Sequence, residues 1–188
     1  MDNIFLYLLG FAGTGKRRLH KHLPAPSAPR LSTITGSITR FSASSIRTVC
    51  RLPDAVWSQT AKVREAVLET IATLAKPGAN FVFTHDGIEG ERYDADVWRG
   101  IQSAAARRGA RLIPVRLVCS EDELVRRIQS ADRAAMLKCT DPADAIYKSR
   151  HHAVLDPRLP GTLTLDVTSL TPEQSVEAIV ALIKSLGS

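Results

Sequence analysis

The chain has 188 residues, of which 44% are hydrophobic and 23% are charged, and its formal net charge is +6. These values are ordinary for a soluble globular protein, and the length suits one α/β domain over residues 1–188. Three cysteines without C-x-x-C spacing indicate neither a disulfide framework nor a zinc site, which favours a cytoplasmic protein.

The basic charge is concentrated in one segment. Residues 17–53 contain seven Lys or Arg residues and no Asp or Glu, which leaves 18 basic and 19 acidic residues in the rest of the chain. Phe41 is the only aromatic residue of this segment, so base stacking has little support. A nucleic-acid partner is therefore not favoured.

The first element is predicted from the apolar run I-F-L-Y-L-L at residues 4–9, which is typical of a buried parallel strand. The run is too short to span a bilayer, and Asp2 stands where a signal peptide would carry basic residues. We therefore expect no membrane partner.

The strand leads into G-F-A-G-T-G-K at residues 10–16, which has the spacing of a phosphate-binding loop. In such a loop the backbone N–H groups converge on phosphates, and the lysine reaches the β- and γ-phosphates. The alternative is a glycine-rich turn with a chance lysine. The candidate nucleotide-binding residues are Gly10, Gly13, Thr14, Gly15, Lys16 and Arg17, and Lys16 is also a catalytic candidate.

The segment after the loop breaks the pattern. A Ser or Thr that holds magnesium usually follows the lysine, but Arg17 occupies this position. Prolines at positions 24, 26 and 29 preclude a full-length helix, and no apolar period persists to about residue 51. We therefore expect an irregular basic segment near residues 17–51.

Regular periodicity returns after this segment. Val63, Ala66, Val67, Ile71 and Leu74 recur at helical spacing and predict one apolar helix face. Thr171-Pro172-Glu173-Gln174 is an N-cap signal for the last helix. Short strands and helices alternate, which predicts a three-layer α/β fold with a parallel sheet flanked by helices, as in P-loop NTPases. The remaining elements are strands at 81–84, 112–119 and 162–166 and helices at 55–76, 94–108 and 121–129.

Four further residues are candidates for chemistry. Asp86 ends a predicted strand, where a carboxylate could hold magnesium or orient a substrate hydroxyl, although Asp86-Gly87 could simply form a turn. Arg126 and Arg127 lie on a predicted helix and Arg133 follows it; lid arginines of small kinases neutralise the transferred phosphoryl group. The alternative is a solvated basic helix face.

Taken together, these stretches resemble a group of uncharacterised bacterial P-loop proteins (AAA-labelled, shikimate-kinase-like) of the nucleoside-monophosphate-kinase-like superfamily. The resemblance implies ATP at the Gly10–Lys16 loop, Arg133 as a lid arginine within a lid at 130–155, and Arg126 or Arg127 beside adenine. With residues 4–16 it covers about four-fifths of the chain. The stretches that carry it are V-R-E-A-V-L-E-T-I (63–71), F-V-F-T (81–84), R-L-I-P-V-R-L-V-C (111–119), E-L-V-R-R-I (123–128), D-R-A-A-M-L-K (132–138) and L-D-V-T-S-L-T-P-E (165–173).

The group usually continues after the lysine with a helix, a second strand and a polar substrate-binding turn. One hypothesis for the departure is that residues from about 17 to 51 are translated in a shifted reading frame. Codons can be chosen for Lys21 to Ile46 so that a one-base shift encodes a helical period, a short apolar strand and an Asp-Asn-His turn. The other hypothesis is a natural flexible basic insert.

The functional expectation is ATP- and Mg²⁺-dependent phosphoryl transfer to a small hydroxylated acceptor, with activity impaired by the atypical segment. Asp86 is the magnesium candidate, and Lys16, Asp86 and Arg133 are the catalytic candidates. The alternatives are a nucleotide-binding protein without kinase activity and, less favoured, a basic nucleic-acid-binding protein. We expect a monomer or a homodimer.

Overall fold

The computed structural model describes residues 3–23, 53–135 and 138–186. Within these residues the strands form one wholly parallel sheet in the order β2-β1-β3-β4. The strand that precedes the glycine loop therefore lies inside the sheet, as a phosphate-loop strand should. The strands are β1 (Ile4–Leu9), β2 (Phe81–His85), β3 (Arg111–Val118) and β4 (Leu163–Asp166).

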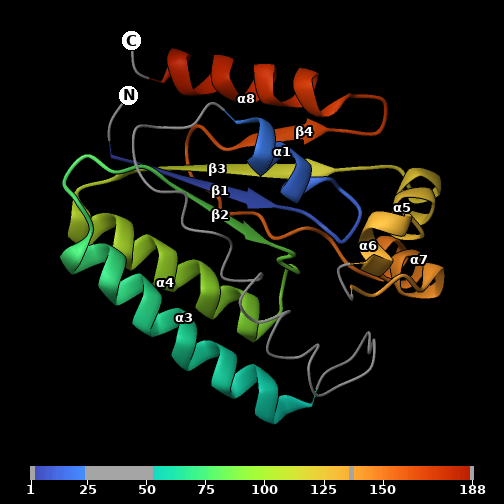
Figure 1. Cartoon of the computed structure of the whole chain (residues 1–188), viewed down its shortest axis with the longest axis horizontal. Helices are drawn as coiled ribbons and strands as arrows, with labels where there is room; N and C mark the ends of the chain where they lie inside the picture. Colours follow the sequence, from blue (N-terminus) through green and yellow to red (C-terminus); the bar gives the residue numbers. More distant parts are fainter. Residues whose placement is uncertain (1–2, 24–52, 136–137, 187–188) are drawn as a thin grey trace.

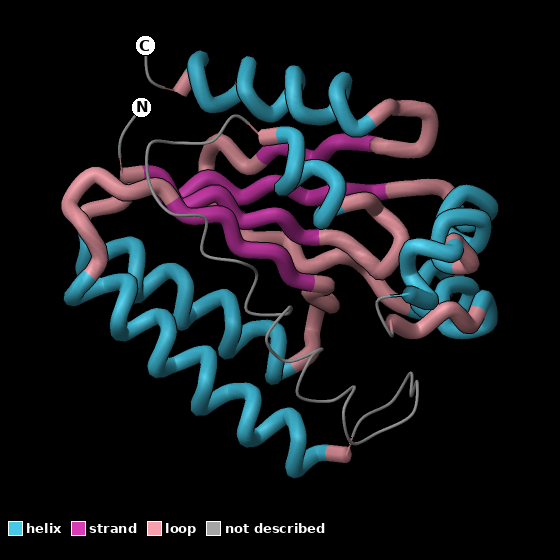
Figure 2. The backbone as a smooth tube through the Cα atoms, viewed as in Figure 1, coloured by secondary structure: helices cyan, strands magenta, loops and turns pink. Residues whose placement is uncertain are grey.

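Helices cover both faces of the sheet, which confirms the predicted three-layer α/β architecture (Figures 1 and 2). α3 (Asp54–Leu74) and α4 (Arg92–Arg108) lie on one face, and α1 (Lys16–His22) and α8 (Pro172–Ser185) lie on the other. Three short helices gather beyond the carboxyl ends of the strands. They are α5 (Glu121–Ile128), α6 (Ala131–Ala135) and α7 (Pro142–His151).

The core consists of two apolar clusters separated by the sheet. Phe5, Tyr7 and Leu9 of β1 belong to the cluster under α3 and α4, whereas Leu6 and Leu8 belong to the cluster under α8. This alternation follows from the two-residue period of a strand. Because β1 is buried on both faces, its sequence is uniformly apolar.

The start of α8 confirms the predicted capping signal. The Thr171 hydroxyl accepts a hydrogen bond from the backbone N–H of Gln174, and the Gln174 side chain accepts one from the backbone N–H of Thr171. This reciprocal pair satisfies two of the N–H groups that a helix start leaves without partners.

The predicted apolar face of α3 is partly wrong. Val63 and Leu74 are 48% and 79% exposed, whereas the buried line of the helix consists of Thr60, Arg64, Leu68 and Ile71. The buried line also follows helical spacing, but it includes a guanidinium group that stacks on an aromatic ring of α4. A search for apolar residues alone cannot find such a face.

The helix after the glycine loop ends early, as the downstream prolines predict. α1 ends at His22, and Leu23 has an extended conformation with φ −59° and ψ 133°. A residue that precedes a proline avoids the helical region, and position 24 is proline. Residues 24–51 of the atypical segment, and with them most of the reading-frame hypothesis, lie outside the described residues.

Two further sequence expectations concern membrane-spanning helices and cysteine pairing. No helix among residues 3–23, 53–135 and 138–186 is long and apolar enough to cross a membrane. Of the described cysteines, Cys119 carries a free thiol and Cys139 is disulfide-bonded, a pairing that the cysteine spacing did not suggest.

Candidate functional site

The glycine loop between β1 and α1 has a backbone shape that only glycine adopts easily. Gly10 and Gly13 have φ values of 151° and 102°. A Cβ atom on Gly10 would lie 2.6 Å from the carbonyl oxygen of Leu117, so the loop packs directly against β3. Both positions therefore require glycine for conformation, and Gly10 also requires it for space.

The loop presents backbone N–H groups at the start of α1. Within residues 3–23, 53–135 and 138–186, the N–H groups of Gly13, Gly15 and Lys16 donate to no backbone carbonyl oxygen. Thr14 is buried, and both its hydroxyl and its N–H donate to the carbonyl oxygen of Phe11, so Thr14 braces the loop from inside. Unpaired N–H groups on such a loop form an anion-binding cradle.

The side chain of Lys16 folds back over this cradle. Its ammonium group donates to the carbonyl oxygens of Gly10 and Phe11, the latter at 3.1 Å, and to the Asp86 carboxylate at 3.0 Å. The Lys16 side chain is only 12% exposed. Burial lowers the pKa of Lys16, and the negative charge of Asp86 opposes this shift. The lysine is thus held inside the loop by groups that a phosphate can replace.

Asp86 immediately follows β2 and meets Lys16 at the carboxyl ends of two neighbouring strands. Burial alone would raise the pKa of Asp86, but the positive charges of Lys16 and Lys148 and the hydrogen bond from Lys16 lower it to about 2. The side chain nevertheless remains 48% exposed. Asp86 is therefore an ionised carboxylate that faces solvent at the mouth of the loop.

A group of cations surrounds this carboxylate. Arg133 of α6 donates to the carbonyl oxygen of Cys139 at 2.9 Å, and Lys148 of α7 pairs with Asp144 at 3.0 Å. Burial, followed by the nearby charges of Arg133, Lys16 and Arg17, lowers the pKa of Lys138 to about 8. The sequence analysis proposed Lys16, Arg17 and Arg133 for this place but missed Lys138 and Lys148.

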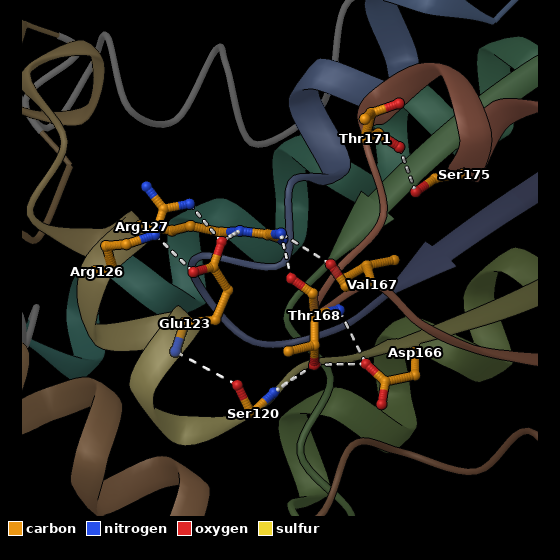
Figure 3. Close-up of polar contacts among 9 residues, drawn as sticks. All are labelled: Ser120, Glu123, Arg126, Arg127, Asp166, Val167, Thr168, Thr171 and Ser175. Atoms are coloured by element: carbon orange, nitrogen blue, oxygen red, sulfur yellow. Dashed lines mark hydrogen bonds and ion pairs between the residues drawn. The ribbon is translucent and has the colours of Figure 1, made fainter.

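Arg126 and Arg127 have different environments (Figure 3). Arg127 is 20% exposed and donates to Glu123 at 2.6 Å and to the carbonyl oxygen of Val167 at 2.8 Å, which ties α5 to the end of β4. Among the residues that the structure describes, Arg126 hydrogen-bonds to Glu123 alone, and its side chain is 72% exposed. Arg127 therefore has a structural position, and Arg126 is the one that remains open to a ligand.

Glu123, the carboxylate between these two arginines, accepts hydrogen bonds from both of them. The hydrogen bond from Arg126, followed by that from Arg127, lowers the pKa of Glu123 to about 2 against the opposing effect of burial. On the same side of the sheet, the Thr168 hydroxyl donates to Asp166 and accepts from the Ser120 N–H at 2.9 Å (Figure 3). The loop after β4 is thus fixed beside α5.

The residues of the loop fit a nucleotide better than they fit a protein-bound metal ion. The unpaired N–H groups and Lys16 suit a polyphosphate. Within the described part of the chain, no group of three or more His, Cys, Asp or Glu residues could hold a metal. Arg17, which is exposed, also replaces the usual hydroxyl ligand. Magnesium would therefore depend on the nucleotide phosphates, with Asp86 as the nearest carboxylate.

Three features define the fold of the P-loop kinases. β1 lies inside the sheet, a glycine loop joins it to α1, and short helices cover the carboxyl edge of the sheet. Known structures of this fold align with almost the whole chain. A presumed kinase of Chloroflexus aurantiacus has a TM-score of 0.64 at 21% identity, over 98% of both chains. A gluconokinase of Sinorhizobium meliloti has a TM-score of 0.59 at 18% identity, over 98% of this chain and 94% of that chain.

A third structure was solved with nucleotide present. The APS kinase of Mycobacterium tuberculosis, in complex with AMPPNP and APS, has a TM-score of 0.57 at 13% identity, over 97% of this chain and 98% of that chain. No protein-family model and no curated protein matches the sequence. These similarities establish the fold, and the chemistry must be argued from the residues of this chain.

Proposed function

We propose that the protein binds ATP at the Gly10–Lys16 loop and transfers its γ-phosphoryl group to a small hydroxylated acceptor. The observation that carries the proposal is the position of Lys16. Its ammonium group is held by two carbonyl oxygens of the loop and by Asp86. A phosphate group offers the lysine a stronger partner than the carbonyls do, because both members of that hydrogen bond are charged.

The catalytic roles follow from this exchange of partners. When Lys16 turns to the phosphates, Asp86 loses the charge that keeps its pKa near 2, so the carboxylate becomes a better acceptor for the proton of a substrate hydroxyl. Arg133, Lys138 and Lys148 then face the transferred group and stabilise its negative charge. Bound magnesium would supply further charge neutralisation at the phosphates.

Arg17 is the reason to expect impaired catalysis. A hydroxyl at this position normally coordinates the metal directly, whereas a guanidinium group brings positive charge toward the metal position. Arg17 also supports the alternative of a protein that binds nucleotide without transferring phosphate. The substitution leaves the lysine and the loop N–H groups intact, so nucleotide affinity should survive better than turnover.

Isothermal titration with ATP, in the presence and absence of Mg²⁺, tests the binding step. A phosphorylation screen over sugars, sugar acids, nucleosides and shikimate-like acids tests the transfer step. We expect ATP binding with weak dependence on magnesium, and slow transfer. Binding without transfer to any acceptor would favour the nucleotide-binding alternative, and absence of ATP binding would refute the proposal.

A further inference from the structure

Arg64, in the middle of α3, is a buried cation that the proposed phosphate chemistry does not use. It is 6% exposed, and its guanidinium lies over the ring of Tyr93, 5.0 Å from the ring centre. The Nη1 atom is fully enclosed and has no hydrogen-bond partner. None of the ion pairs among the described residues includes Arg64, although burial of a charged group without a counterion is costly.

Arg108 of α4 shows what a structural arginine looks like in the same pair of helices. Its guanidinium lies 5.3 Å from the centre of the Phe81 ring, so it makes the same kind of ring contact. Its Nη1 atom, however, donates to the carbonyl oxygens of Ile71 and Ala75 at 2.9 and 3.0 Å. Arg108 thus satisfies the last carbonyl groups of α3 and leaves its Nε atom as its one buried nitrogen without a partner. Arg64 interacts with the Tyr93 hydroxyl, but its buried Nη1 atom has no acceptor among the described residues.

A second unsatisfied donor lies within the electrostatic range of Arg64. The hydroxyl of Tyr7 is buried and has no partner, and burial raises the pKa of this phenol, so that it remains protonated. Arg64 and Asp94 both influence the Tyr7 hydroxyl. Two orphaned donors in one place indicate a missing acceptor, because native structures pair nearly all buried polar groups.

A polar pair borders the same place. His85 Nε2 lies 2.7 Å from Asp94 Oδ1, and the other Asp94 oxygen accepts from the Ile88 N–H at 2.6 Å. His85 also stacks on Tyr7, with ring centres 6.4 Å apart. Asp94 is therefore already occupied, and its contacts hold the histidine in a fixed orientation at the end of β2.

This cluster of Arg64, Tyr7, Tyr93, His85 and Asp94 lies next to the phosphate loop but under the other face of the sheet. The carbonyl oxygen of His85 accepts from the Gly10 N–H at 3.2 Å, and the next residue is the Asp86 that holds Lys16. A molecule that reaches the cluster from the carboxyl end of β2 would therefore pass beside the site of phosphoryl transfer.

We propose that Arg64 and Tyr7 bind an oxyanion, a carboxylate or phosphate group, that belongs to the phosphate acceptor. The inference rests on the proposed kinase function and narrows its acceptor to hydroxylated acids or phosphate esters. Tyr93, which is partly exposed and covers the guanidinium, is the ring that must move to admit the anion. His85 and Asp94 form the polar wall of the subsite.

The test uses the full chain and three polyols that differ only in the group at C1: D-glucitol, D-gluconate and D-glucitol 1-phosphate. Isothermal titration is performed on the wild type, Arg64→Gln, Tyr7→Phe and the control Arg108→Gln. We expect at least one anionic polyol to bind the wild type about tenfold more tightly than glucitol, as a charge-assisted pair would give. Arg64→Gln should abolish this preference, and Tyr7→Phe should reduce it several-fold.

Arg108→Gln should lower the unfolding midpoint but keep the preference, which separates loss of stability from loss of the subsite. The carboxylate and phosphate arms show which oxyanion the subsite takes. A second measurement avoids dependence on the polyol: in Lys16→Met, inorganic phosphate should raise the unfolding midpoint only while Arg64 is present. A wild type without anion preference, or a preference that survives Arg64→Gln, overturns the proposal. ATP titration of Arg64→Gln reports separately on the proposed function.

Discussion

Asp86→Asn tests the ion pair at the centre of the site. The substitution keeps the shape of the side chain but removes the negative charge that faces Lys16 at 3.0 Å. Against the opposing effect of burial, Lys16, with smaller contributions from Lys148 and His85, lowers the pKa of Asp86 from 3.8 to about 2. Fully expressed, that shift corresponds to about 2.4 kcal/mol of stability. Because the carboxylate is 48% exposed and burial of Lys16 acts against the pair, we expect about 1 kcal/mol after solvent screening.

The pH dependence of this loss has a definite sign. A carboxyl group whose pKa is lower in the folded state contributes stability above its unfolded pKa, and the contribution disappears as the pH falls through the folded value. The free energy of unfolding of the wild type should therefore exceed that of Asp86→Asn at pH 7, and about half of this difference should remain at pH 3. At pH 7 the unfolding midpoint should fall by roughly 2–4 °C for a chain of this length.

Urea unfolding at pH 7, 4 and 3, followed by circular dichroism, measures the difference directly. Asp132→Asn is the matched control, because Asp132 also forms an ion pair, with Arg18 at 3.3 Å, but both side chains are more than half exposed. The control should change stability by less than about 0.5 kcal/mol. Equal losses in the two variants, or a loss for Asp86→Asn that is independent of pH, would show that the pair does not hold Lys16 as described.

Three further predictions concern the loop, the arginines of α5 and the last helix. Lys16→Met should reduce ATP affinity at least tenfold in isothermal titration while circular dichroism stays unchanged. Arg127→Ala should destabilise by about 1–3 kcal/mol in urea, because it leaves the Val167 carbonyl without its donor, whereas Arg126→Ala should change ATP affinity with little effect on stability. Thr171→Ala should cost about 1 kcal/mol in the same urea assay through loss of the α8 cap; an unchanged midpoint would contradict the capping role.

The sheet and its covering helices could be predicted because their signals are local. The apolar run of β1, the glycine spacing of the loop and the Thr171 cap each depend on a few adjacent residues. α7 was missed although Asp141 and Pro142 provide a start signal: the Asp141 side chain accepts from the Ala143 N–H. The signal was present, but the apolar period behind it is weak, since Ala145 is the buried residue that the helix contributes.

The cationic surroundings of the loop could not be predicted in full, because they depend on tertiary proximity. Lys138 lies in the segment between α6 and α7, whereas Lys148 lies in α7, ten residues further along the sequence. Only the folding of α6 and α7 over the carboxyl edge brings both near Asp86. The burial of Arg64 is a similar case. Sequence patterns predict an exposed position for a charged helix residue, and only the tertiary structure shows that the ring of Tyr93 covers Arg64.

The three carbonyl contacts of Arg108, with Ile71, Ala75 and Lys76, have a mechanical consequence. They fasten the last turn of α3 to the last turn of α4, and the ion pair between Arg107 and Glu69 adds a second link at the same end. The other end of the helix pair is joined by the ring contact of Trp57 with Tyr93 and by Arg64 over the same ring. A movement that admits an acceptor should therefore separate the helices at the Tyr93 end, where ring contacts rather than several hydrogen bonds must be broken.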